Sequence, residues 1–507
     1  MNGMVASSQR AASRVGADIL RAGGNAADAA VAMAAALNVT EPCSTGIGGD
    51  CFALYYADGI TALNGSGRAP AGLSLDRVSA LSLYDANAVT VPGACAGWFD
   101  LIARHGSMPM RDILAPAIQL AEKGFEVQPV TAHFWDAGLP HLSSGELSID
   151  GRAPRAFETF RNPGLARTFR AIAADGPDAF YRGPIGESIV RVLRARGGAM
   201  TMDDLASHTS TWEEPLSTEF HDVRVWECPP NGQGLAALIA VNIFKRFDAS
   251  GVDRWHLMIE AMRLALDAAQ TYIADPAFAA IPVQELLSEE YARRCAALVR
   301  LDRTLELHPG RPALASSDTV YLCVLDTFGH ACSFINSNYL GFGTGIIPDG
   351  WGFTLQNRAC TFSFERGHSN ALAPRKRPYH TIIPGMLTRT HDNALRGTFG
   401  VMGGYMQPQG HLQILEALAS GLSPQAAVDR PRFRIDPPSA DGRVYLEEGF
   451  PPDVVEALRA RGHEVVADVR GHDRVMFGRS QIILRADDGA VVGGSDSRAD
   501  GCCIEVR

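Results

Sequence analysis

Three short stretches of the sequence carry residues that could do chemistry. They are Asp318-Thr319, Tyr379-His380-Thr381 and the glycine pair Gly403-Gly404. A threonine hydroxyl becomes a nucleophile when a nearby base accepts its proton, and glycine allows backbone N–H groups to come close to a developing oxyanion. The chain has no HExxH, GxSxG, Walker A or protein-kinase signature, which excludes several common enzyme classes.

Two other combinations compete with these stretches. Cys323 and His380 could form a nucleophile and its base, but Cys323 lies within an apolar strand pattern, which is typical of a structural cysteine. The run Gly46-Ile47-Gly48-Gly49 suggests an NAD-binding loop, but it follows a helix and precedes a strand, whereas a Rossmann loop joins a strand to a helix. We therefore interpret it as a tight turn that leads into a strand.

The elements that must position these residues follow from apolar periodicity. A helix is predicted over 10–22, ending at Gly23-Gly24, and Asn25 with Asp28 predicts a capped, almost fully buried alanine-rich helix over 26–37. Further helical patterns make the first half mostly helix, at about 94–105, 111–123, 165–174, 185–196, 234–246, 253–273 and 284–298.

The pattern changes after a polar, Pro/Gly-containing linker over 299–318. Residues 319–325 and 331–335 are rich in β-formers and predict a hairpin. Strands are also predicted at 381–388, 443–447, 480–485 and 490–493, with helices at about 408–420 and 452–461 between them.

The composition is that of a globular chain with a sizeable core. The sequence has 507 residues, 46 Lys and Arg, 56 Asp and Glu and a formal net charge of −10, so neither nucleic acid nor an anionic membrane is a predicted partner. The ten cysteines show neither CxxC nor metal-ligand spacing, so no metal site is predicted. Cys502 and Cys503 are adjacent and cannot easily form a structural disulfide, and the other eight, in apolar surroundings, are predicted to be reduced core residues. Because the chain also has no secretory or membrane-spanning apolar run, the expected compartment is the cytoplasm.

Eight motifs in order, over nearly the whole chain, resemble the γ-glutamyltransferase (glutathione hydrolase) family. They are Gly23-Gly24-Asn25-Ala26-Ala27-Asp28-Ala29-Ala30, Gly46-Ile47-Gly48-Gly49, Val91-Pro92-Gly93, Asp318-Thr319, Phe342-Gly343-Thr344-Gly345, Lys376-Arg377-Pro378, Gly403-Gly404 and Asp496-Ser497-Arg498. The resemblance implies an α+β N-terminal-nucleophile hydrolase with four layers, αββα, made as a proenzyme that cuts itself before a threonine.

On this resemblance the cut falls between Asp318 and Thr319. It gives a large chain of residues 1–318 and a small chain of 319–507, which stay together as one heterodimeric unit, and a dimer of such heterodimers is compatible with the family. Cleavage would also create the base, since a new α-amino group has a reference pKa of about 7.7–8.0 whereas an amide nitrogen cannot accept the proton. Without the resemblance, β propensity alone explains an Asp-Thr pair that opens a strand.

The resemblance also assigns the other catalytic positions. Gly403 and Gly404 match the pair whose N–H groups face the oxyanion, and Ser337 matches a second hydroxyl that contacts the nucleophile. A flexible turn and an ordinary strand serine are the alternative interpretations.

The predicted substrate pocket departs from the family pattern. Ser66 stands where the family has an arginine that binds the glutamyl α-carboxylate, and Arg68 follows two residues later. Thr361 replaces the acidic residue that holds the α-ammonium, and Arg358, after Asn357, takes a position usually held by a neutral glutamine. The remaining differences are a His380-Thr381 pair in place of two serines and Tyr339 in place of an asparagine.

A pocket with arginines and no carboxylate favours an anionic acyl group that carries no ammonium. Oxamate amidohydrolases and cephalosporin (glutaryl) acylases, which are branches of the same family, act on such groups, and the run from Gly403 to Gln409 looks closer to the oxamate type. We therefore predict a small anionic amide as substrate and no cofactor, with substrate-binding roles for Arg68, Tyr339, Asn357, Arg358, Thr361, His380 and Thr381.

Three alternatives stay open at this point. The chain could be a true γ-glutamyltransferase, an uncut and non-catalytic binding protein on the same scaffold, or an NAD-dependent oxidoreductase built on the Gly46–Gly49 loop. Arg68 and Arg358 could also be surface charges.

Overall fold

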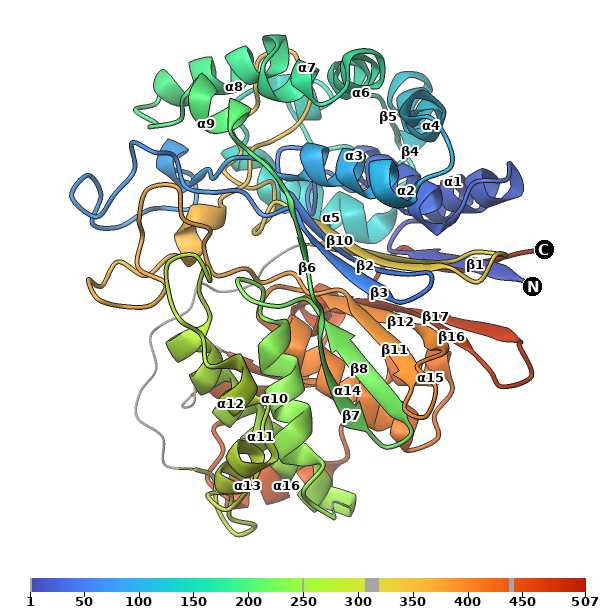
Figure 1. The fold of residues 1–507 in the computed structure, drawn as a ribbon, viewed down its shortest axis with the longest axis vertical. Helices are drawn as coiled ribbons and strands as arrows, with labels where there is room; N and C mark the ends of the chain where they lie inside the picture. The colour runs from blue at the N-terminus through green and yellow to red at the C-terminus, as the bar shows by residue number, and fades with distance from the viewer. Residues whose placement is uncertain (1, 249, 306–318, 437–441) are drawn as a thin grey trace.

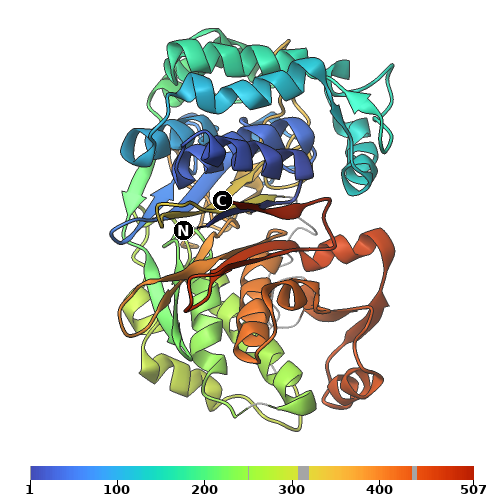
Figure 2. The ribbon, with the colours of Figure 1, turned by 90° about the vertical axis from the view of Figure 1, so that its right-hand side faces the viewer.

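Two β-sheets lie face to face at the centre of the molecule, and helices cover the outer face of each (Figures 1 and 2). The computed structural model describes residues 2–248, 250–305, 319–436 and 442–507. Within them the first sheet contains, in spatial order, β18 (Cys502–Val506), β1 (Gly3–Ser7), β9 (Val320–Leu325), β10 (Ala331–Ser337), β2 (Asp50–Tyr56), β3 (Ile60–Asn64) and β6 (Thr211–Glu213). The second contains β17 (Val491–Ser495), β16 (Arg479–Arg485), β12 (Leu395–Met402), β11 (Gly385–Arg389), β8 (Val223–Glu227) and β7 (Leu216–Phe220).

The helices divide between the two outer layers in chain order. The first sheet is covered by α1 (Arg10–Arg21), α2 (Ala26–Thr40), α3 (Ala94–His105), α4 (Met110–Lys123), α5 (Pro129–Gly138), α6 (Pro163–Asp175), α7 (Asp178–Tyr181), α8 (Pro184–Arg194) and α9 (Met202–Ala206). The second is covered by α10 (Gly234–Phe244), α11 (Gly251–Tyr272), α12 (Val283–Leu286), α13 (Glu289–Ala296), α14 (Met406–Ala419), α15 (Pro424–Asp429) and α16 (Pro452–Ala460). The predicted four-layer αββα arrangement is confirmed.

Strand β9 shows why the sequence builds two stacked sheets. Val320, Leu322 and Val324 pack against the helices of the first layer, while Tyr321 and its alternate neighbours pack between the sheets. Side chains of a strand alternate between its two faces, so a strand that is apolar at every position must be buried on both. The run Val320–Leu325 is buried throughout, as this rule requires.

Helix α2 lies against β9 and β10 and fits closely because it is rich in alanine. Asn25 accepts hydrogen bonds from the N–H groups of Ala27 and Asp28, and the Asp28 carboxylate accepts one from the Asn25 N–H, which makes the predicted capping box. The whole helix is buried, as its composition predicts.

Most predicted elements are present, but the first half contains more sheet than expected. Strands β1, β3, β6, β7 and β8 were missed there, although β7 and β8 pair around a short turn at His221-Asp222. In the second half β12 and β18 were missed as well. The predicted helix over 284–298 is two helices, because the Ser288 side chain caps the start of α13. The predicted strand over 381–388 starts only at Gly385, since the Ile383 N–H donates to the Gln407 side chain instead of to a neighbouring strand.

The remaining elements are short. They are a sheet of β13 (Phe433–Asp436), β14 (Arg443–Glu447) and β15 (Val465–Val469), a pair of β4 (Phe125–Glu126) and β5 (Thr159–Phe160), and the 3-10 turns η1 (Ala86–Ala88), η2 (Leu139–His141), η3 (Gly145–Leu147), η4 (Arg358–Thr361) and η5 (Gly471–Phe477). Among the cysteines, Cys360 is only partly buried, so its assignment to the core was wrong. No helix in the described part of the chain is long and apolar enough to cross a membrane.

Candidate active site

Thr319 and Ser337 face each other at one end of the β9–β10 hairpin. Thr319 immediately precedes β9 and Ser337 is the last residue of β10, and the two strands are antiparallel with Val320 opposite Asn336. This register brings the two hydroxyl oxygens to 2.9 Å, and both residues are buried. Asp318, the other side of the predicted cut, lies outside the described residues.

A buried arginine connects this hydroxyl pair to a third one. Arg358, in η4, donates to the Ser337 Oγ at 3.2 Å and to the Thr381 Oγ1 at 2.7 Å, and its guanidinium lies 4.7 Å from the centre of the Tyr339 ring. Burial lowers the pKa of Arg358 to about 10, and the charge of Asp50 opposes this shift. Among the described residues no carboxylate forms an ion pair with Arg358, so its charge is held mainly by hydroxyl groups and a ring face.

Tyr339 is held by a strained turn after β10. Its φ of 81° is in the left-handed region, which is costly for a bulky residue, and its N–H donates to the Ser337 Oγ at 2.9 Å. The same hydroxyl oxygen therefore contacts Thr319, Tyr339 and Arg358, which fixes its position next to Thr319.

Gly403 and Gly404 form the turn between β12 and α14. Their φ values are 124° and 57°, so Gly403 in particular has a backbone conformation that other residues rarely adopt. The N–H groups of both glycines donate no hydrogen bond to any described residue, whereas their carbonyl oxygens accept bonds from the start of α14. The turn thus leaves two adjacent backbone donors available.

His380 contacts an aspartate, Asp50, instead of the Thr319 hydroxyl group. Its Nε2 lies 3.0 Å from the Oδ2 of Asp50, and both side chains are fully buried. Burial and the charge of Arg358 lower the pKa of His380 to about 3, which keeps the ring neutral. Burial alone would raise the pKa of Asp50, but the hydrogen bond from His380 and the positive charge of Arg358 hold it below its ordinary value.

Two further predicted substrate-binding residues are used to hold the backbone. The Asn357 side chain accepts from the Leu340 N–H at 3.1 Å and donates to the Gly343 carbonyl at 3.0 Å. The Thr361 hydroxyl contacts the carbonyl oxygens of Arg358 and Tyr379 at 2.8 and 2.7 Å. These contacts place η4, and Arg358 with it, against the segment that carries Thr381.

Arg68 is not part of this group. Its guanidinium contacts the Thr209 carbonyl at 3.4 Å and lines a separate cavity of about 230 Å³ with His208 and Arg375. The sequence predicted a substrate-binding role for Arg68 from its motif position, whereas in this structure the Arg68 side chain lies with residues 204–209. Ser66, at the family's arginine position, is buried and contacts Asn231.

A family of known proteins matches this chain over nearly its whole length. The family model described as Gamma-glutamyltranspeptidase matches residues 12–506. The chain belongs to this family.

Its relatives include several kinds of proenzyme. The chain is 34% identical to the glutathione hydrolase-like YwrD proenzyme of Bacillus subtilis, over 99% of this chain and 98% of that protein, and 33% identical to the oxamate amidohydrolase proenzyme of Klebsiella pneumoniae over the same shares. The crystal structure of a cephalosporin acylase from Bacillus halodurans superposes with a TM-score of 0.93 at 42% identity, covering 99% of this chain and 95% of that one. This member of the γ-glutamyltranspeptidase family thus has the N-terminal-nucleophile hydrolase fold and is a hydrolase of amide bonds.

Motif reasoning missed several polar residues around the site of this family member. Asp50 follows the glycine motif directly and accepts hydrogen bonds from the N–H groups of Gly67 and Gly93 and from the Gln356 side chain. Gln233, at the start of α10, donates to the carbonyl oxygens of Thr381 and Gly404. An acidic residue in a glycine-rich turn was a visible signal for Asp50, whereas Gln233 stands in an ordinary helix start.

The rival nucleophile Cys323 does not contact His380 in this structure. It is buried within β9 and packs between the two sheets, and burial raises the pKa of its thiol far above the ordinary value. A thiol with a raised pKa is a poor nucleophile.

One group within the described residues could hold a metal ion, namely His256, Glu260 and His463. The His256 Nδ1 is 2.8 Å from the His463 Nε2, and the Glu260 carboxylate accepts hydrogen bonds from the Thr304 hydroxyl and the Leu305 N–H. Arg263 lies 3.5 Å from the same carboxylate. Because these donors already have partners and a guanidinium is adjacent, we assign the group a structural role.

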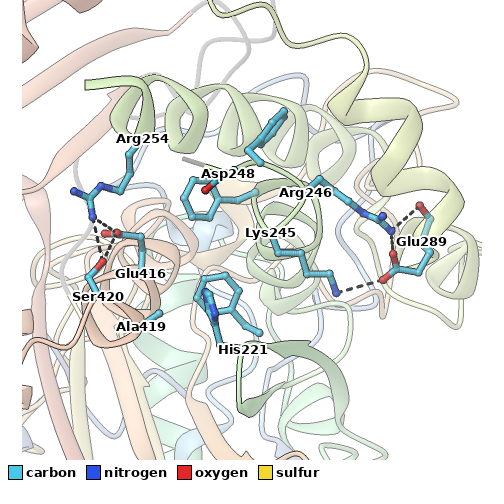
Figure 3. A pocket seen from close by; sticks show the side chains of 12 residues that line it. His221, Lys245, Arg246, Asp248, Arg254, Glu289, Glu416, Ala419 and Ser420 are labelled. Carbon is cyan, nitrogen blue, oxygen red and sulfur yellow. Dashed lines mark hydrogen bonds and ion pairs between the residues drawn. The ribbon is translucent and has the colours of Figure 1, made fainter. Parts of the chain in front are cut away.

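Figure 3 shows a cavity of about 530 Å³ in the outer helical layer that covers the second sheet. Arg254 contacts Glu416 and Ser420 on one side of it, and Arg246 and Lys245 contact Glu289 on the other. Its lining contains none of the predicted catalytic or substrate-binding residues, so it is distinct from the site around Thr319.

Proposed function

We propose that this protein is an autoprocessed amidohydrolase in which Thr319 is the nucleophile. Scission before Thr319 would free its α-amine, which then accepts the hydroxyl proton while the oxygen attacks the substrate carbonyl. The same proton passes to the leaving amine when the C–N bond breaks, and water hydrolyses the resulting ester. The observation that carries the proposal is the 2.9 Å contact between the Thr319 and Ser337 hydroxyls at the predicted cut.

In this scheme Gly403 and Gly404 stabilise the oxyanion. Their N–H groups donate to no described residue, as expected for donors reserved for a ligand. Donors of this type are worth about 2.7–4 kcal/mol in kcat where they have been removed.

For the acyl group we propose a small anion without an ammonium, of the oxamate or glutaryl type. Arg358 has a full positive charge and is bound mainly by the hydroxyl groups of Ser337 and Thr381. Ser337 in turn contacts Thr319. A carboxylate of the substrate would neutralise this charge, whereas the ammonium of a γ-glutamyl group would be repelled by it. Asp50 partly balances Arg358, but its own carboxylate is occupied by His380, Gln356 and two backbone N–H groups.

Thr319, Ser337, Arg358 and Thr381 are all fully buried. Hydrogen bonds and charge interactions between buried groups are stronger than at the surface, which supports their assignment to the reacting site.

The test begins with purified wild-type protein. A denaturing gel with N-terminal sequencing should show two chains, the smaller beginning Thr-Val-Tyr. Turnover of oxamate and glutaryl-p-nitroanilide should then exceed that of γ-glutamyl-p-nitroanilide. A single uncut chain favours the binding-protein alternative, and equal or faster turnover of the γ-glutamyl substrate favours a true γ-glutamyltransferase.

A further inference from the structure

Gln233 is the residue that joins the two halves of the candidate site. It is fully buried at the start of α10, one of the helices that cover the second sheet (Figure 1), and it belongs to the predicted large chain. Thr381 and Gly404, which it contacts, both belong to the predicted small chain.

The side-chain amide of Gln233 has every donor in use. Its Nε2 donates to the Thr381 carbonyl at 2.5 Å and to the Gly404 carbonyl at 2.8 Å, and its Oε1 accepts from the Tyr379 hydroxyl at 2.9 Å. Two carbonyl acceptors and one hydroxyl donor leave only one orientation of the amide that satisfies all three partners.

The backbone holds the same residue in place. The Gln233 N–H donates to the His380 carbonyl at 3.0 Å, and the His380 N–H donates to the Asn231 carbonyl at 2.8 Å. The segment before α10 thus pairs with the segment that carries His380 and Thr381, and the Gln233 side chain then extends from this pair to the glycine turn.

These contacts link the two groups that the proposed reaction needs. Thr381 binds Arg358, which would hold the acyl anion, and Gly404 is one of the two predicted oxyanion donors. A shift of either segment changes the distance between the anion-binding arginine and the oxyanion donors.

We propose that Gln233 is a positioning residue that sets the spacing between the acyl-anion site and the oxyanion site. This inference rests on the proposed function. Loss of the amide removes the Gln233 donor from the buried Thr381 carbonyl and leaves the Gly404 carbonyl with the Gln407 N–H alone, so the direct link between the Thr381 segment and the glycine turn is lost.

The main variants are Gln233→Leu, which keeps the size but removes all three hydrogen bonds, and Gln233→Glu, which turns a carboxylate oxygen toward two carbonyl oxygens. For the cleaved enzyme we expect kcat on an anionic amide to fall roughly 10- to 100-fold, with a smaller change in KM, because misplaced oxyanion donors act on the transition state. The rate of self-cleavage, followed on a gel, should fall as well.

Gln413 offers a matched control. It is buried in α14, its Nε2 donates to the carbonyl oxygens of Gln409 and Phe433 at 3.0 Å each, and its Oε1 accepts from the Phe433 N–H. Gln413→Leu removes the same kind of bonds away from the site, so it should lower Tm as Gln233→Leu does but leave kcat of the cleaved enzyme nearly unchanged.

Tyr379→Phe is the second variant, for the case that the Gln233 variants remain uncut or fail to fold. It removes only the hydroxyl that orients the amide and should lower kcat by a smaller factor, with no further loss when it is combined with Gln233→Leu.

If the wild type is active and Gln233→Leu keeps kcat within about threefold, the role of Gln233 is overturned. It is also overturned if Gln413→Leu lowers kcat as much as Gln233→Leu does. If the Gln233 variants are uncut, an unchanged kcat in Tyr379→Phe overturns it. A wild type that neither cuts itself nor hydrolyses any amide of the panel overturns the proposed function, and the role of Gln233 with it.

Discussion

At the scale of single residues, the site depends on three hydroxyl groups and one arginine that lie within hydrogen-bond reach of one another. Arg358 donates to the Ser337 and Thr381 hydroxyls at 3.2 and 2.7 Å, and the Ser337 hydroxyl lies 2.9 Å from that of Thr319. None of these residue types is unusual, and it is their burial together that makes them candidates for catalysis.

Replacing Thr319 with alanine removes the proposed nucleophile for both scission and hydrolysis. We expect a single chain of 54.3 kDa with no amidase activity, whereas Thr319→Ser should still cut itself, though more slowly. Denaturing gels and amide hydrolysis check this. Two bands and normal turnover from Thr319→Ala would contradict it.

Arg358→Gln removes the buried positive charge and should change substrate preference. We expect kcat/KM for glutaryl-p-nitroanilide to fall roughly 10- to 100-fold, the equivalent of a charge-assisted hydrogen bond of about 1.5–3 kcal/mol. Butyryl-p-nitroanilide, which lacks the carboxylate, serves as the neutral control and should be affected less. Equal losses on both substrates would mean that Arg358 only supports Ser337 and Thr381.

At the scale of elements, the turn between β12 and α14 has a backbone that only glycine fits well. Gly403 has a φ of 124°, which side chains other than hydrogen rarely allow, while Gly404 at 57° lies in the left-handed helical region. A Cβ at Gly403 would also lie 3.2 Å from the Gly478 backbone.

Gly403→Ala should therefore be much more harmful than Gly404→Ala. The left-handed conformation at position 404 costs alanine about 1–2 kcal/mol, whereas position 403 must change its conformation and move a predicted oxyanion donor. We expect kcat to fall roughly 100-fold or more in Gly403→Ala, with a smaller loss in Gly404→Ala. The measurement is kcat of the cleaved protein, with Tm as the measure of folding. A larger loss of kcat in Gly404→Ala than in Gly403→Ala would contradict the assignment of this turn as the oxyanion site.

At the scale of the whole molecule, each of the two large sheets contains strands from both predicted chains. In the first sheet β1 lies between β18 and β9, and β2 lies beside β10, so large-chain and small-chain strands are neighbours at several places. In the second sheet β8 pairs with β11 across the same chain boundary.

The two chains should therefore stay together after scission. Separating them breaks several strand pairings and exposes the apolar layer between the sheets. We expect cleaved protein to elute as one species from a size-exclusion column and to resolve into two chains only in denaturant. Separation of the chains in native buffer would contradict this arrangement.

Acid should destabilise the molecule through its buried neutral histidines. Burial lowers the pKa of His463 to about 2, whereas an unfolded histidine has a pKa of about 6.5. The unfolded state therefore binds a proton that the folded state does not, so this stabilisation is complete above pH of about 6.5 and is lost progressively as pH falls toward 2, at about 1.4 kcal/mol per pH unit. Below pH of about 4.5 carboxylates add their own effect.

The apparent Tm should thus fall between pH 7 and about pH 5, and it should fall less in His463→Asn than in the wild type. His391→Asn is the control, because it makes the same replacement at an exposed histidine. If the Tm of His463→Asn falls with pH as steeply as that of the wild type, another group causes the loss of stability in acid.

The sequence by itself determined those helices, strands and site residues that depend on neighbours close by in the chain. The capping box of α2, the β9–β10 hairpin and most helices follow from residues within a few positions of one another, and the ordered motifs determined the family and the four-layer fold. The contact of Thr319 with Ser337 is of the same kind, because a hairpin register fixes it.

Only the tertiary structure decided which polar groups surround Thr319. The Asp50–His380 pair joins residues 330 positions apart, and the contact between Gln233 and Gly404 joins residues 171 apart. Arg68 and Arg358 looked equivalent in sequence, yet one contacts Thr209 and the other Ser337. Side-chain direction depends on how distant segments pack, and local propensity and spacing contain no information about that packing.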